Sequence, residues 1–364
     1  MWVPVANNVV CIVVLVWFAQ LAGSHPSLAG LEAHQGQLVL LGLGTTLGVV
    51  VQFALLVLAA RGARLSLLRW RFDPRHEAVR RVLRLGGWTF GFVLANQICL
   101  FVVLALAAGA RGSDPVAAYT YAYTFLQMPY AVVAVSIMSA VTPDLAARWA
   151  TSDLPAFRRR LSGGLRAMLA VIFPAAMGML LLAKPVTALL LGHGATSVGD
   201  TVIVGQALAM FSLGLPGFCV FLYVVRVLQA MQRTRVAFWL YLLENAINVV
   251  LAVALVHPLG VRGLALALSV AYTVAALVGL GVLRLWLGHL GGPHAWQSLP
   301  RVLVATVVMG VAVAVVSSLF TATQGFDLLV RVVASVAVGI VVFVGVAAVM
   351  GRRAAARRVR FNPR

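Results

Sequence analysis

Ten long apolar runs follow one another along this chain, and they constrain its fold more than any motif does. The runs cover approximately residues 3–22, 38–60, 87–109, 116–142, 165–191, 201–228, 236–257, 261–287, 300–320 and 327–350. A helix that crosses the roughly 30 Å hydrocarbon core of a bilayer needs about 20 apolar residues. Each run is close to that length, so we predict an all-α integral membrane protein of about ten transmembrane helices.

Composition excludes an ordinary soluble protein. Of the 364 residues, 62% are hydrophobic and only 10% are charged, whereas soluble domains carry about 25% charged residues. The formal net charge of +19 would also fit a protein that binds nucleic acid. However, all basic residues except Lys184 are arginines, and nearly all lie between the apolar runs. Insertion bias and anionic lipid account for such basic loops, so we expect membrane lipids and no nucleic acid as partners.

The arginines also predict which side of the membrane each connection faces. The connection 61–84 holds eight arginines, the next holds only Arg111, and basic and base-poor connections alternate to the end of the chain. Because basic loops stay in the cytoplasm, both termini of this chain are predicted to lie inside. An even number of crossings agrees with that topology. The stretch 61–86 is predicted to be a basic amphipathic cytoplasmic loop.

The N-terminus passes abruptly into the first apolar run. A signal peptide begins with a basic region and ends at a small-residue cleavage site. Neither feature occurs around Met1–Pro4 or the residues that follow. We therefore expect the natural beginning of the protein to lie upstream.

Polar side chains inside the runs are the best indicators of function, because placing them in hydrocarbon is costly. They are Asn96, Gln97, Tyr119, Tyr121, Tyr123, Thr124, Gln127, Arg226, Glu244, Asn245 and Asn248. Each has a structural alternative. Asn and Gln join helices by hydrogen bonds, tyrosines form interfacial belts, and Arg226 can extend to the inner interface.

Glu244 is the only acidic residue well inside a run. Three interpretations stay open for it: a neutral carboxyl, an ion pair with Arg226, Arg233 or Arg235, or a role in proton coupling.

Glycines and prolines predict irregular or closely packed helices. Five prolines interrupt or end the runs: Pro129, Pro143, Pro174, Pro185 and Pro216. Such prolines kink helices and often lie beside a cavity or hinge. Glycine pairs at four-residue spacing, Gly44 with Gly48 and Gly87 with Gly91, predict close helix contacts.

The sequence has no pattern typical of catalysis or metal binding. Cys11, Cys99 and Cys219 all lie within apolar runs without metal-ligand spacing, and the histidines are scattered. We therefore expect no enzymatic activity, no metal and no cofactor.

One region resembles a known family. Tyr119–Pro129 (YTYAYTFLQMP), followed by the small-residue stretch Ala134–Pro143, resembles the eighth helix of the MurJ/MviN lipid II flippases. Further similar stretches are Phe157–Pro174, Leu208–Gly214, Ala230–Arg235 and Asn248–Ala267. The chain is similar to actinobacterial members of this family, which lies in the multidrug/oligosaccharidyl-lipid/polysaccharide exporter superfamily.

The resemblance implies a fold of about fourteen helices in two lobes, in which this chain matches the last ten. Its opening Pro4–Asn8 resembles the start of the family's fifth helix, so the first four helices are expected to be missing. The implied division is an N-lobe remnant at 1–60, the basic loop at 61–86, a six-helix C-lobe at 87–287, two last helices at 288–350 and a basic cytoplasmic tail at 351–364.

The resemblance further implies transport of lipid II, the undecaprenyl-pyrophosphate-linked peptidoglycan precursor, across a bacterial plasma membrane by alternating access. The expected substrate-binding residues are Asn96, Gln97, Tyr123, Thr124 and Gln127 as cavity lining and Arg226 as a cationic contact. The polyprenyl tail is expected along the last two helices, Val302–Phe320 and Leu328–Met350. Cell-wall synthesis proteins are candidate partners.

The sequence also departs from the family pattern. Thr124 stands where many members have arginine, and Val236 and Ala237 stand where the family has proline. Some members bind sodium through polar side chains. At three of those positions this chain has the apolar residues Val103, Ala252 and Leu268, and only Asn248 is retained. The resemblance therefore does not extend to sodium coupling. Two other functions stay open: an exporter of another lipid-linked sugar or amphipathic small molecule, and a non-transporting scaffold for cell-envelope synthesis.

Overall fold

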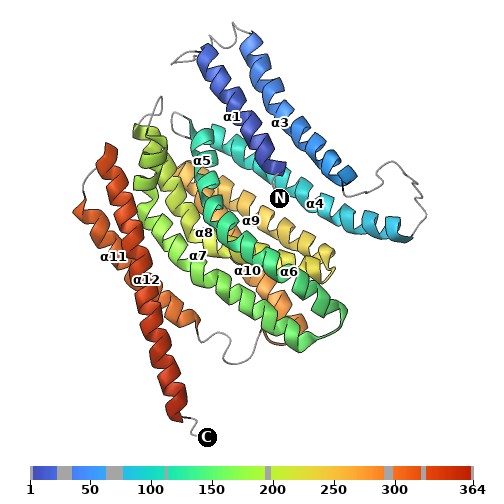
Figure 1. The fold of residues 1–364 in the computed structure, drawn as a ribbon, viewed down its shortest axis with the longest axis vertical. Helices are drawn as coiled ribbons and strands as arrows, with labels where there is room; N and C mark the ends of the chain where they lie inside the picture. Colours follow the sequence, from blue (N-terminus) through green and yellow to red (C-terminus); the bar gives the residue numbers. More distant parts are fainter. Residues whose placement is uncertain are drawn as a thin grey trace. The chain divides into compact units, whose positions relative to one another are not determined.

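All secondary structure in the described part of the chain is helical (Figure 1). The computed structural model describes residues 3–22, 35–62, 77–110, 114–192, 198–290, 298–320 and 325–361. Its helices are α1 (Val3–Ala22), α3 (Gln35–Gly62), α4 (Glu77–Ala108), α5 (Pro115–Pro129), η1 (Tyr130–Ala134), α6 (Val135–Ala150), α7 (Leu154–Leu191), α8 (Val198–Ala230), α9 (Thr234–Leu259), α10 (Val261–Leu287), α11 (Leu299–Leu319) and α12 (Gly325–Phe361). The predicted all-α fold class is confirmed for these residues.

Each predicted apolar run lies within helix, apart from the last residue of two runs, Gly109 and Phe320. Among the described residues, nine helical segments are long and apolar enough to cross a membrane, and Val5–Leu21 of α1 is a shorter apolar helix. One of the nine, Pro115–Ala150, comprises α5, η1 and α6 together. The boundaries differ most at α7, which begins at Leu154, and at α12, which reaches Phe361. Of the predicted loop 61–86, residues 63–76 lie outside the described residues, and α4 begins at Glu77.

The chain divides into two compact units, Met1–Arg80 and Arg81–Arg364. In the first unit α1 packs against α3. Glycine makes this possible, because a Cβ added at Gly44 would lie 2.6 Å from Val14 Cγ1 and one at Gly48 would lie 3.2 Å from the Asn7 carbonyl oxygen. The predicted close contact at this glycine pair is confirmed. The finer division into five segments stays a prediction.

The other predicted glycine pair is confirmed at one position only. A Cβ added at Gly91 would lie 3.0 Å from Phe238 Cε2 of α9. At Gly87 it would meet no atom of the described residues within 4 Å. The close contact predicted at Gly87 is therefore not seen among the described residues.

In the second unit α8 is the central helix and packs against α7, α10 and α5. The Tyr223 hydroxyl of α8 donates a hydrogen bond to the Leu161 carbonyl of α7 at 2.9 Å. On the α10 side, a Cβ at Gly217 would lie 2.7 Å from Thr273 Cα, and Ser269 Oγ donates to the Met210 carbonyl at 2.8 Å. Small residues and interhelical hydrogen bonds are the contacts that hold helices together in lipid, where apolar packing alone gives little preference.

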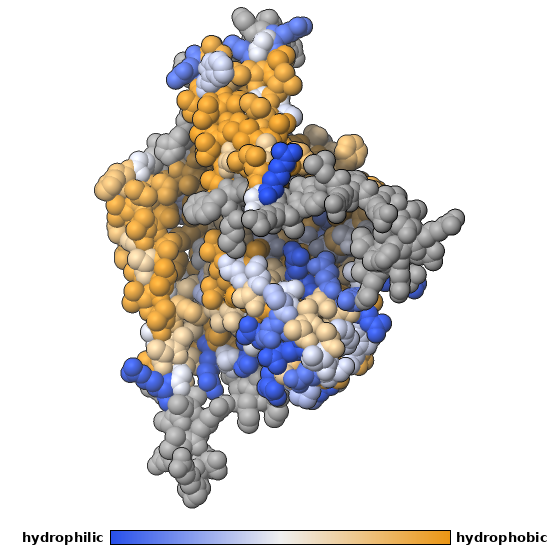
Figure 2. All heavy atoms as spheres, turned by 45° about the vertical axis from the view of Figure 1, so that its right-hand side comes forward, coloured by the Kyte–Doolittle hydropathy of each residue, from blue (hydrophilic) through white to orange (hydrophobic). Residues whose placement is uncertain are grey.

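The outer surface is largely apolar, as expected where lipid is the solvent. On the face drawn in Figure 2, hydrophobic residues cover large areas of the described helices, and hydrophilic residues gather in patches. Large exposed side chains include Phe101, Leu285 and Phe326, each at least 75% exposed.

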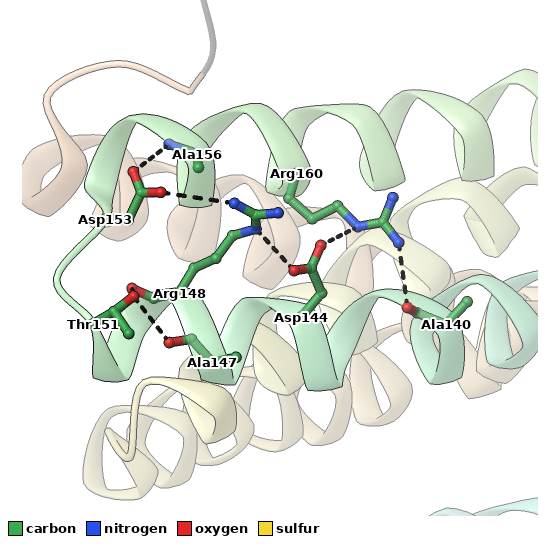
Figure 3. Close-up of polar contacts among 8 residues, drawn as sticks. All are labelled: Ala140, Asp144, Ala147, Arg148, Thr151, Asp153, Ala156 and Arg160. Carbon is green, nitrogen blue, oxygen red and sulfur yellow. Dashed lines mark hydrogen bonds and ion pairs between the residues drawn. The ribbon is translucent and has the colours of Figure 1, made fainter.

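The turn between α6 and α7 is held by an ion-pair cluster (Figure 3). Asp144 accepts from Arg148 Nε at 2.8 Å and from Arg160 Nε at 2.9 Å. Asp153 accepts from the Ala156 backbone N–H at 3.1 Å and so caps α7, and it lies 3.7 Å from Arg148 Nη1. The cluster joins the end of one helix to the start of the next at a connection predicted to be cytoplasmic.

Candidate functional site

A π-helix interrupts the membrane span that carries three of the predicted site residues. Pro129 ends α5 and has no N–H to continue the α-helical ladder, and η1 follows directly. The Val135 N–H bonds to the carbonyl of Tyr130, five residues earlier. The Tyr130 ring packs edge-on against Phe218 of α8, with ring centroids 4.9 Å apart. Single π-helical turns inside α-helices are frequent at functional sites.

The side chains of α5 divide between an open face and a packed face. Thr120 and Thr124 are exposed, and Thr124 Oγ1 donates to the Thr120 carbonyl at 2.8 Å. Gln127 is half-buried. Tyr123 is also half-buried, and its ring lies 6.4 Å from that of Tyr119 and 5.9 Å from that of Phe211 on α8. Of the predicted residues on α5, Thr124 and Gln127 are therefore open to a ligand, and Tyr123 mainly packs.

The other predicted residues lie on different helices. Asn96 and Gln97 are exposed on α4. Arg226 is exposed on α8, and its Nη1 donates to Gln229 Oε1 at 3.4 Å. Among the described residues, no hydrogen bond or ion pair joins these three to α5. Their assignment as substrate contacts stays a prediction.

An apolar pocket of about 500 Å³ lies between α5, α7, α8, α11 and α12. Its lining residues are Phe125, Met128, Pro129, Val171, Pro174, Ala175, Gly178, Met179, Leu182, Val186, Leu190, Leu208, Met309, Val313, Val336, Gly339, Ile340 and Phe343. None of them is charged, and the volume is within the ~300–1,000 Å³ typical of ligand pockets. The pocket can accept hydrocarbon and offers nothing to an ionic group.

The sequence anticipated part of this pocket. The last two helices do line it, as expected for a tail groove, but α7 contributes more residues than either. The sequence feature that could have identified α7 as part of the pocket is the pair Pro174 and Gly178, which lie one turn apart. Both residues line the pocket together with Pro129. The prediction that prolines lie beside a cavity is thus confirmed for Pro129 and Pro174.

Glu244 on α9 is the one buried acidic residue among the described residues of the second unit. Its side chain is 1% exposed, and neither carboxylate oxygen has a hydrogen-bond partner among the described residues. One turn away, Asn248 Nδ2 donates to Cys99 Sγ of α4 at 3.4 Å.

The arginines proposed as partners of Glu244 are engaged elsewhere. Arg233 lies over the Trp286 ring at 5.3 Å and Arg235 over the Trp88 ring at 5.6 Å, whereas Arg226 bonds to Gln229. The ion-pair interpretation of Glu244 is therefore wrong for the described residues.

Comparisons with known proteins place this architecture in a family. The family model described as "Lipid II flippase MurJ" matches residues 1–334. A probable lipid II flippase MurJ of Rhizobium meliloti is 29% identical over 85% of this chain and 56% of the relative, and one of Rhizobium tropici is 32% identical over 72% and 48%. The chain thus spans about half the length of the curated relatives it matches.

Solved structures show the same fold. A structure titled "Lipid II flippase MurJ, inward closed conformation" aligns with a TM-score of 0.70 at 19% identity, covering 97% of this chain and 67% of that chain. A structure titled "Crystal structure of MATE P26A mutant" aligns with a TM-score of 0.60 at 20% identity, covering 79% of this chain and 61% of that chain. This multi-pass membrane chain therefore belongs to the MurJ lipid II flippase family.

Proposed function

We propose that this chain moves lipid II, or a closely related lipid-linked precursor, from the inner to the outer leaflet by alternating access. Lipid II combines a polar sugar–pyrophosphate headgroup with a long hydrocarbon tail, so a transporter needs two different surfaces side by side. The headgroup would follow polar side chains, and the tail would stay in an apolar environment.

The observation that carries this proposal is that α5 borders both kinds of surface. Thr120, Thr124 and the half-buried Gln127 present polar groups on one face. Phe125, Met128 and Pro129 line the apolar pocket from another. A headgroup on the polar face and a tail in the pocket would thus be attached to the same helix, and the π-helix that follows offers a place for that helix to bend.

Arg226 is the proposed cationic contact for the pyrophosphate. It is exposed, and among the described residues it makes a weak hydrogen bond to the neutral amide of Gln229. An arginine can hold a phosphate oxygen with two parallel hydrogen bonds. Asn96 and Gln97 on α4 are proposed to contact the sugars, because exposed amides donate and accept hydrogen bonds equally well.

The proposed location is the bacterial plasma membrane, with both termini of this chain in the cytoplasm. The arginine-rich connections support this orientation, as does the Arg148–Asp144–Arg160 cluster at the α6–α7 turn. Cell-wall synthesis proteins are proposed as partners, since they supply and consume the lipid-linked precursor.

The test is translocation by the purified protein in lipid vesicles. Vesicles receive fluorescent lipid II, an undecaprenyl-linked sugar of different structure, or an amphipathic dye, and a membrane-impermeant quencher reports the outer leaflet. We expect protein-dependent movement of lipid II, reduced by Arg226→Gln and unchanged by Asp144→Asn. Movement of only the other sugar or the dye supports a different cargo, and movement of none of them supports a scaffold.

A further inference from the structure

An unpaired carboxyl group at the centre of a membrane helix bundle needs a compensating cation. Glu244 lies in α9 well away from both helix ends, with a side chain only 1% exposed. Both of its oxygens lack a hydrogen-bond partner among the described residues. Burying an ionised carboxylate without a partner costs several kcal/mol or more. A chain that keeps such a group therefore neutralises it.

The groups around Glu244 offer no fixed cation. The ionisable groups in electrostatic range are Cys99 of α4, Tyr119 and Tyr123 of α5, Tyr241 of α9 and Tyr272 of α10. Thiol and phenol groups are neutral or negative, never positive. On α8, Arg226 is in electrostatic range of Tyr130 and Tyr241, but it is exposed and bonds to Gln229. No ion pair to Glu244 occurs in the described part of the chain.

We propose that Glu244 is a proton-binding site, which holds a proton while α4 is packed on α9 and exchanges it with water when α4 moves away. The step is a simple acid dissociation, in which the carboxyl O–H breaks, the oxygen keeps the electron pair and a water molecule takes the proton. A proton is the cation that fits this site, because no group of three or more His, Cys, Asp or Glu side chains that could hold a metal ion occurs among the described residues. Asn248 donates its amide nitrogen to Cys99 rather than to Glu244, and its Oδ1 has no hydrogen-bond partner among the described residues.

The contact between α4 and α9 is suited to opening. It includes two hydrogen bonds of Cys99 Sγ, one from Asn248 Nδ2 at 3.4 Å and one to the Asn245 carbonyl at 3.9 Å. The rings of Phe92 and Tyr241 stack at 4.6 Å, Phe238 approaches Gly91 and lies 5.3 Å from the Trp88 ring, and Arg235 lies over Trp88 at 5.6 Å. A hydrogen bond to sulfur is weak, and no ion pair closes this contact among the described residues.

Coupling of the proton to lipid transport rests on the proposed function, but proton binding itself does not.

The test uses dicyclohexylcarbodiimide, an apolar reagent that modifies protonated carboxyl groups in membranes. The full chain in lipid nanodiscs is treated without substrate, and the modified peptide is identified by mass spectrometry. We expect labelling at Glu244 that is stronger at about pH 6 than at about pH 9, where more of an exchangeable carboxyl is ionised. Glu244→Gln removes the label, and the matched variant Asp144→Asn keeps it.

A second measurement addresses folding. Gln cannot ionise but has the shape of protonated Glu, so Glu244→Gln should unfold at the same temperature as the wild type or slightly higher. Absence of label at both pH values, protection of Glu244 by sodium at constant pH, or a large loss of stability in Glu244→Gln would each overturn the proposal. Since no lipid II is used, failure of the proposed function leaves the labelling result intact, and the reverse also holds.

Discussion

Filling the apolar pocket should slow transport without harming the fold. Gly178 on α7 lines the pocket, and a Cβ added there meets no described atom within 4 Å. Leucine at this position adds four carbons of roughly 30 Å³ each, the volume of a water molecule in the liquid. About 120 Å³ of the pocket's approximately 500 Å³ would then be occupied. Gly178→Leu should therefore fill part of the space for the tail without clashing with neighbouring side chains.

The size of the effect follows from which force acts on the tail. Lipid is as apolar as the pocket, so the hydrophobic effect contributes little to tail binding. The fit between the tail and the pocket walls therefore determines the binding free energy. Overfilling a packed apolar site costs about 1–3 kcal/mol, which corresponds to roughly 5- to 150-fold weaker binding. Helix propensity acts in the opposite direction, because replacing glycine by leucine in a helix stabilises it by up to about 0.8 kcal/mol.

The assay pairs lipid II movement in vesicles with thermal unfolding in detergent. Gly178→Leu should reduce the transport rate while the unfolding temperature stays equal or rises. The matched control is Gly163→Leu on the same helix, which also meets no described atom within 4 Å and lies outside the pocket lining. Undiminished transport by a Gly178→Leu protein that inserts normally would refute the assignment of this pocket to the tail.

Three further changes test the packing, the α6–α7 turn and the polar face. Gly217→Leu should abolish folded protein in the membrane, because even its Cβ would lie 2.7 Å from Thr273 Cα of α10; correct insertion by fluorescence size-exclusion would contradict this. Asp144→Asn should lower the unfolding free energy by only about 0–1 kcal/mol, since its ion pairs are partly exposed, and the difference should shrink in high salt. Arg226→Gln should cut lipid II transport by roughly tenfold or more, as expected for a charged hydrogen bond of about 1.5–3 kcal/mol, with an unchanged unfolding temperature because the side chain is exposed.

The helices could be predicted because each membrane crossing requires a long run of apolar residues, and such runs are visible in the sequence. About 20 apolar residues are needed per crossing, and the runs found on that basis lie within α1 and α3–α12. Their polar ends were harder to place. Residues 154–164 of α7 are helical but include Arg158, Arg159 and Arg160. Hydropathy alone therefore predicted the start of this helix too late in the chain.

The pocket and the state of Glu244 depend on tertiary packing, which a single sequence does not display. Val171, Gly178 and Met309 are ordinary residues of apolar helices until α7, α11 and α12 are placed together. The pairing of Glu244 with an arginine was reasonable from charge alone. It fails because Trp286 and Trp88 lie close enough to engage Arg233 and Arg235 instead.

The most direct test of the proposed function is lipid II exposure in cells depleted of their own flippase. The protein and its Gly178→Leu variant are expressed at equal levels, and lipid II on the outer leaflet is quantified with an impermeant probe. The wild-type chain should restore outer-leaflet lipid II, and Gly178→Leu should restore much less. Outer-leaflet lipid II that stays at the depleted level, despite normal membrane insertion of the wild-type chain, would contradict the proposed function.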